Sequence, residues 1–91
     1  MNALWYRTLD FLRRRKADYQ LALKSPAGER VLEDLARFCR ANQTVFVPGD
    51  PDLTKVLIGR QEVWLRIQQH LGLTPEQLMK LYAPNLGERD D

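Results

Sequence analysis

The side chains that could carry out chemistry in this sequence are few and lie far apart. His70 is the single histidine and Cys39 the single cysteine among 91 residues. A zinc site needs several cysteine or histidine ligands, and a catalytic triad needs a histidine beside a nucleophile and a carboxylate. We therefore expect His70 to cap or pack the end of a helix and Cys39 to be a small core residue. A metal site built from histidines is excluded without a partner.

Paired carboxylates are the remaining candidates for acid–base chemistry, and each pair has a structural explanation. They are Glu33/Asp34, Asp50/Asp52 and Asp90/Asp91. The first pair is expected on a solvent-facing side of a helix, the second at a helix start, and the third in the tail. The Pro48-Gly49 turn lacks the glycines of a phosphate-binding loop. We expect no enzyme, no catalytic residues and no cofactor.

Length and composition indicate one globular domain. The chain is 44% hydrophobic and 29% charged, and no apolar run approaches the roughly 20 residues of a membrane span. Basic residues interrupt the N-terminal segment, which argues against a signal peptide. The unpaired cysteine favours a reducing compartment. The net charge of +2 is unevenly placed, because residues 1–24 hold six basic and two acidic residues.

The strongest electrostatic feature is a run of four basic residues, Arg13, Arg14, Arg15 and Lys16. Such a run could bind phosphates, or an anionic surface beside Trp5 and Phe11. The alternative is a solvated helix face balanced by Asp10 and Asp18. No helix-turn-helix or aromatic RNA-binding pattern accompanies the run, so sequence-specific recognition of nucleic acid has no support.

Helical periodicity and capping residues predict an all-α fold. Ser25, Asp50 and Thr74 each precede a proline and should begin a helix. The expected fold is a compact bundle of three main helices plus a short C-terminal helix, with an extended apolar connector. The expected parts are a basic N-terminal helix over 1–24 whose first half projects, a helical core over 25–82, and a flexible acidic tail over 83–91.

Two of the expected helices have further details that the structure can test. The helix after Ser25 should bury one arc, made of Val31, Leu32, Leu35, Phe38 and Cys39, and stop near Asn42. The connector residues Val45, Phe46 and Val47 should pack against the core. Gly72 should close the helix that starts at Asp50, in a left-handed turn.

That central helix is the element around which the domain is organised. Leu53, Leu57, Trp64 and Leu71 share one face with Arg60, and we expect Arg60 and Trp64 to organise the core. A partly buried arginine needs acceptors, such as Asp34 or backbone carbonyls. Its neighbour Gly59 suggests that another backbone or side chain comes close there. The alternative role for Arg60 is to bind a partner. Ile58 and Leu65 point another way and are candidates for contact with a partner.

Several short motifs resemble a small, poorly characterised family of tailed-phage (podophage) proteins typified by a Bordetella phage protein. They are Ser25-Pro26-Ala27-Gly28 before Val31-Leu32, Asp34-Leu35, Phe38-Cys39, the Phe46 segment, and Gly59-Arg60 before Trp64-Leu65-Arg66-Ile67. The resemblance covers residues 17–82. Ile58 departs from the pattern, and the basic N-terminal arm lies outside it. The resemblance implies a role in or around the virion and brings no catalytic residues.

The function that we predict is that of a small virion-associated or virion-assembly protein acting through protein–protein contacts. Its partners would be other virion proteins (capsid, portal or tail) and further copies of itself, in the host cytoplasm during assembly and in the virion. The partner-binding residues would be Trp5, Phe11, Arg13, Arg14, Arg15, Lys16, Ile58 and Leu65. The alternative is a nucleic-acid-binding or host-directed regulatory protein that uses residues 13–16.

Overall fold

The computed structural model describes residues 3–82, which form four helices and no strand. The helices are α1 (Ala3–Leu23), α2 (Pro26–Phe38), α3 (Pro51–Gly72) and α4 (Pro75–Tyr82). The all-α class, with three main helices and a short fourth, is therefore confirmed. The acidic tail expected over residues 83–91 lies outside the described residues.

The two long helices that follow turns begin where their capping residues predict. The Ser25 hydroxyl accepts a hydrogen bond from the Gly28 amide at 3.0 Å. The Asp50 carboxylate accepts one from the Leu53 amide at 2.9 Å. Each bond satisfies a backbone donor that the first turn of a helix otherwise leaves without a partner.

The helix ends differ from the sequence prediction. α2 stops at Phe38 rather than near Asn42, because Arg40 takes a left-handed conformation with a φ of 53°. Gly72 does not adopt the expected left-handed turn. It is the last residue of α3, and the extended Leu73 ends the helix instead.

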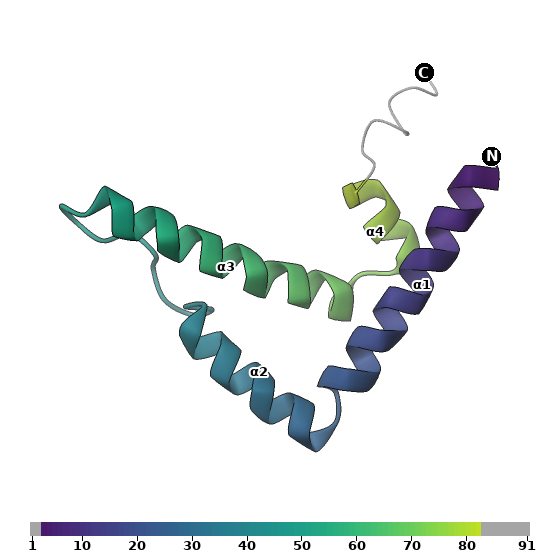
Figure 1. Cartoon of the computed structure of the whole chain (residues 1–91), viewed down its shortest axis with the longest axis horizontal. Helices are drawn as coiled ribbons and strands as arrows, with labels where there is room; N and C mark the ends of the chain where they lie inside the picture. Colours follow the sequence, from purple (N-terminus) through teal and green to yellow (C-terminus); the bar gives the residue numbers. More distant parts are fainter. Residues whose placement is uncertain (1–2, 83–91) are drawn as a thin grey trace.

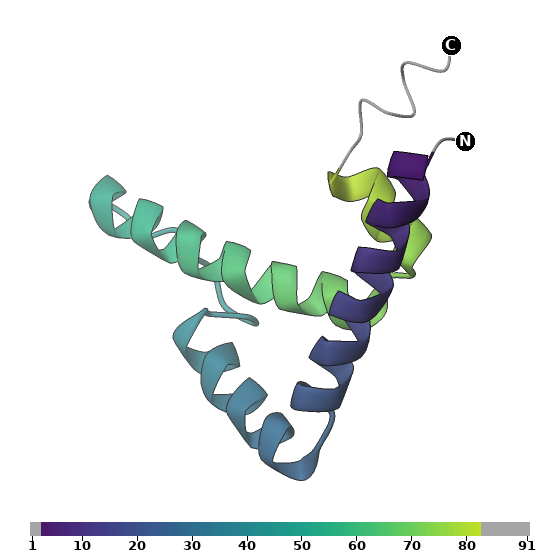
Figure 2. The same ribbon diagram turned by 45° about the vertical axis from the view of Figure 1, so that its right-hand side comes forward.

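The helices are spread out in a thin arrangement measuring 49 × 36 × 14 Å. α1, α2 and α3 form the sides of a triangle, and α4 lies beside the first half of α1 (Figures 1 and 2). The radius of gyration is 16.3 Å, whereas a close-packed chain of this length would have about 12 Å. Much of each helix surface therefore remains open to a partner.

The best-packed part of the molecule is the corner between α1 and α4. Leu12, Leu78 and Met79 are buried there, with Trp5 and Leu73 packed against them. The expectation that the first half of α1 projects is therefore wrong. α1 is part of the core, because α4 covers the apolar side of its first half.

Short-range hydrogen bonds fix the start of α4. Thr74 and Gln77 form the predicted capping box, in which each side chain bonds the other residue's backbone amide, at 3.0 and 3.1 Å. Leu73 packs next to the core cluster as a hydrophobic staple. An eight-residue helix is marginal alone, so α4 depends on this cap and on its packing against α1.

The connector between α2 and α3 is only partly packed. Val45 and Val47 are half-buried, as predicted, and the Val47 amide bonds the Thr54 hydroxyl at 3.0 Å. Phe46 points into solvent with 65% of its surface exposed. The prediction that it packs against the core is wrong, because successive side chains of an extended segment point to opposite sides, and Phe46 points away from the side of Val45 and Val47.

Lys16 joins α1 to the end of α3. Its ammonium group donates hydrogen bonds to the carbonyl oxygens of Leu71, at 3.3 Å, and Leu73, at 2.6 Å. The last carbonyls of a helix have no partner within the helix and carry partial negative charge. Lys16 therefore supplies both hydrogen bonds and favourable charge at this junction.

Replacing Lys16 with methionine should lower the free energy of unfolding by about 1–2 kcal/mol, because two carbonyls lose a charged donor. Arg14→Met is the matched control, since it removes the same charge from an exposed residue of the same run. The control should change stability by less than about 0.5 kcal/mol. Urea unfolding followed by circular dichroism measures both. Equal effects of the two changes would contradict the role of Lys16.

Candidate functional site

His70 lies in a closed aromatic cluster. Its side chain is fully buried, its ring stacks on Tyr19 with centroids 4.5 Å apart, and its Nδ1 lies 2.9 Å from the Arg66 carbonyl oxygen. That oxygen can only accept, so Nδ1 carries the proton and Nε2 accepts from the Tyr82 hydroxyl at 2.8 Å. Both ring nitrogens are therefore satisfied, and the predicted packing role is confirmed.

Cys39 is a core residue, as predicted, with 2% of its surface exposed. Within residues 3–82, no group of three or more histidine, cysteine and acidic side chains is placed to hold a metal ion. The described helices also include none that combines the length and hydropathy needed to cross a bilayer.

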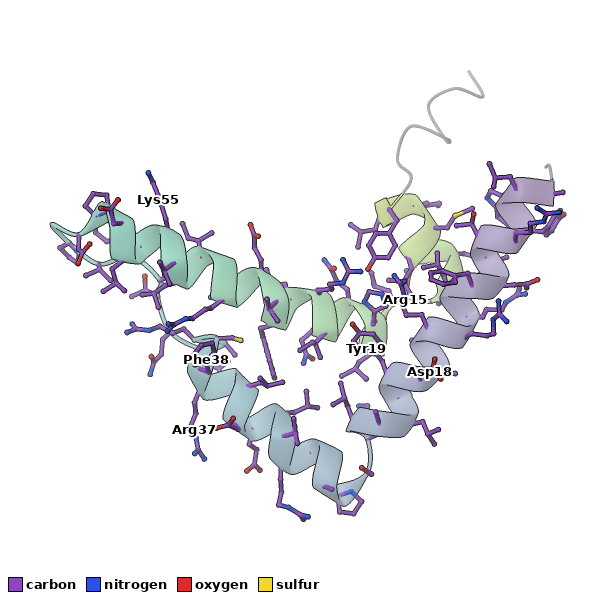
Figure 3. The ribbon with its side chains drawn as sticks, in the orientation of Figure 1. Arg15, Asp18, Tyr19, Arg37, Phe38 and Lys55 are labelled. Atoms are coloured by element: carbon purple, nitrogen blue, oxygen red, sulfur yellow. The ribbon has the colours of Figure 1, made fainter. Side chains whose placement is uncertain are left out.

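Arg60 links α3 to α2 in a different way from the one predicted. Its guanidinium lies over the ring of Phe38, 4.2 Å from the centroid, and no carboxylate or carbonyl of residues 3–82 bonds it. Figure 3 shows Phe38 near the end of α2, on the side of α3. The polar bond between the helices comes from the neighbouring Gln61, whose amide donates to the Arg40 carbonyl at 3.1 Å. Trp64 is half-buried.

Gly59 does not mark a close approach within the chain. A Cβ atom built on it meets nothing within 4 Å. The close approach expected at Gly59 is therefore not made by residues 3–82, because α2 contacts α3 on the side of Arg60 and Gln61.

The four side chains of the basic run 13–16 have different surroundings. Arg13 pairs with Asp10 at 3.0 Å and lies 3.8 Å from Glu76. Arg15 stacks over Phe11 at 4.3 Å. With the Lys16 ammonium group on the carbonyls at the end of α3, only Arg14 of the run has no such contact among the described residues. The four charges do not form a continuous strip.

The two aromatic residues expected to bind a partner have different surroundings. Trp5 is half-buried and packs against the Leu12 cluster, so it contributes to the fold. Phe11 is 46% exposed, with the Arg15 guanidinium over its ring. Figure 3 shows Arg15 on the part of α1 that lies near α4. Phe11 and Arg15 therefore present a combined apolar and cationic surface.

Ile58 and Leu65 lie on the surface of α3, with 43% and 51% of their areas exposed. They are seven residues apart, or about two helical turns, so they share one side of the helix. That side lies about 100° from the direction of Leu57 and Trp64, which face the rest of the domain. We call the pair the 58/65 surface.

Sequence reasoning missed the exposure of part of α2. Val31 and Phe38, assigned to its buried arc, are 50% and 56% exposed. Both lie at the edge of that arc, seven residues apart, whereas Cys39 and the half-buried Leu32 and Leu35 lie further round. The edge position was visible in the sequence, but the limited contact between α2 and α3 was not.

Comparison with known proteins agrees with the motifs in the sequence. No curated protein and no solved structure matches the chain significantly. A family described as Bbp19-like phage protein matches residues 19–83, which cover the end of α1 and the whole of α2, α3 and α4. Since the match spans well over half of the 91 residues, the chain belongs to the Bbp19-like phage protein family.

Proposed function

We propose that this chain is a virion-associated or virion-assembly protein of the phage, acting through protein–protein contacts. The observation that carries the proposal is the 58/65 surface. Two large apolar side chains at helical spacing stay exposed on the longest helix, and the thin arrangement of helices leaves that side uncovered. Aligned exposed apolar residues are typical of protein interaction sites.

The partner would be another virion protein with an apolar groove or helix face. A helix that presents residues at i and i+7 is a common form of recognition between proteins. Phe11 and Arg15 on α1 would add a second contact, in which the aromatic ring gives apolar area and the guanidinium favours an acidic partner.

Binding of nucleic acid through residues 13–16 has less support. Electrostatic binding of DNA depends on several cationic groups that reach phosphates together. Here the ammonium group of Lys16 is bound to carbonyls of the fold and Arg13 is paired with acidic residues. Any docking role of this run therefore rests on Arg14 and Arg15.

Complementation of a phage that lacks this gene tests the proposal. The Ile58→Glu/Leu65→Glu variant should fold normally and reduce the yield of complete particles at least about tenfold, because two charges would be buried in the contact. Gln20→Glu/Gln68→Glu is the control, since it adds the same two charges at exposed polar positions of α1 and α3 that lie outside the 58/65 surface. Particles are counted by electron microscopy and plaque assay.

Mass spectrometry of purified particles and of assembly intermediates completes this test. The chain should be present in at least one of them. Full particle yield with the Ile58→Glu/Leu65→Glu variant, or absence of the chain from every particle and intermediate, would contradict the proposal.

A further inference from the structure

The outer side of α3, turned away from α2, carries a symmetrical set of exposed residues around Gly59. Asp52, Lys55 and Val56 precede the glycine, and Glu62, Val63 and Arg66 follow it. At about 100° per residue all seven fall within about 120° of the helix circumference. Figure 3 shows Lys55 pointing away from α2. We call this set the outer face of α3.

Gly59 lies near the middle of the outer face. Glycine is among the poorest helix formers, and its advantage in a helix is that another backbone can approach closely. Within the described chain nothing uses that space, because a Cβ atom there would meet no atom within 4 Å. No helix of residues 3–82 packs on Gly59, so a helix of a second molecule has room to approach its backbone.

The outer face is self-complementary when a second copy of it runs in the opposite direction. If a second α3 crosses antiparallel with Gly59 against Gly59, Val56 lies opposite Val63 of the second copy. Lys55 then faces Glu62 of the second copy, and Asp52 faces Arg66 of the second copy. Apolar residues meet apolar residues and opposite charges meet, as a two-fold symmetric interface requires.

We infer that the outer face of α3 binds a second copy of this chain, in an antiparallel dimer centred on Gly59. The charged groups are available for it, because Asp52, Lys55 and Glu62 form no ion pair within residues 3–82. Arg66 has its guanidinium 5.2 Å from the centroid of the Tyr82 ring and is an exposed residue. Val56 and Val63 are 50% and 53% exposed in the single chain.

The interface is small, so the dimer should be reversible. Residues 52–66 extend about 22 Å along the helix. A contact of two helices over that length buries less than the roughly 800 Å² per partner of a standard interface. We therefore expect a dissociation constant in the micromolar range, and a mixture of monomer and dimer at concentrations that sedimentation analysis covers.

This dimer and the proposed virion function can fail independently. The 58/65 surface lies about 160° round the helix from Val56 and Val63, so it stays open when two outer faces meet. A chain that is absent from particles could still dimerise, and a monomeric chain could still bind a virion protein.

Sedimentation equilibrium of the full chain tests the inference, with Gly59→Leu as the main variant. Leucine favours a helix and finds open space in the single chain, so folding should be kept, with an unchanged circular dichroism spectrum. The side chain would hold the two helices apart and should raise the dissociation constant at least about tenfold. Leu65→Glu is the control on the 58/65 surface and should dimerise as the wild type does.

Charge exchange tests the antiparallel register. Two-fold symmetry gives the dimer two pairs of Lys55 with Glu62. Lys55→Glu turns both pairs into two facing carboxylates, and Glu62→Lys turns both into two facing ammonium groups. Each should weaken dimerisation by about three- to tenfold at low salt. The double variant restores opposite charges and should dimerise like the wild type. A wild type that stays monomeric at several hundred micromolar, a Gly59→Leu variant that dimerises normally, or a double variant as weak as the single ones would overturn the inference.

Discussion

Replacing Gly28 with alanine is expected to destabilise the protein by at least about 3 kcal/mol, because the added methyl group meets backbone rather than flexible side chains. A Cβ atom on Gly28 would lie 2.5 Å from the Leu23 Cα and 2.7 Å from its carbonyl carbon, and closer still to the carbonyl oxygen of Ala22. Those atoms belong to the last turn of α1, so relief requires the corner between α1 and α2 to open.

Opening this corner should affect the whole domain. A domain of this size has a total free energy of unfolding of about 5–14 kcal/mol, so the loss is a large share of it. A loss of 3 kcal/mol should lower the melting temperature by about 12 °C or more. Thermal unfolding followed by circular dichroism measures the shift.

Gly72→Ala is the matched control for this prediction. Gly72 also lies in a helix, but a Cβ atom on it meets nothing within 4 Å and its φ is not positive. Alanine should leave the melting temperature unchanged or raise it by a few degrees, because alanine favours helix more than glycine does. A melting temperature for Gly28→Ala close to that of Gly72→Ala would contradict the close contact of α1 and α2.

Helix starts could be predicted from the sequence because their causes are local. Ser25, Asp50 and Thr74 each bond an amide three residues ahead, and those bonds need no information from the rest of the fold. The burial of His70 and Cys39 was also predictable, since single residues of these types without partners for chemistry are usually packed.

The contacts between helices could not be predicted in the same way. Whether the first or the second half of α1 is covered depends on where the chain turns after α3 and brings Leu78 and Met79. The partner of Arg60 was expected to be a carboxylate or a backbone carbonyl, but the guanidinium lies over the ring of Phe38 because α2 ends beside α3. Helical periodicity gives the direction of a side chain on its own helix and leaves open what it meets.

The same limit applies to the candidate site. The exposure of Ile58 and Leu65 followed from their position on the helix, whereas the use of Lys16 within the fold did not follow from a run of four basic residues. A lysine that reaches the end of another helix can be recognised only when the angle between the two helices is known. That Gly59 faces open space could be known only once the position of α2 was known.

Replacing Leu78 with alanine should cost about 3 kcal/mol of stability and release α4 from α1. Leu78 has no exposed surface and touches the Leu12 and Met79 cluster, so the change leaves a cavity at the best-packed point of the fold. An eight-residue helix that loses this contact should lose its helical structure. Hydrogen exchange of the α4 amides should then become faster well below the melting temperature. Leu81→Ala, on the same helix but 44% exposed, should change the stability by less than about 1 kcal/mol. If the two variants exchange equally slowly, the packing of α4 on α1 is not what holds this helix in place.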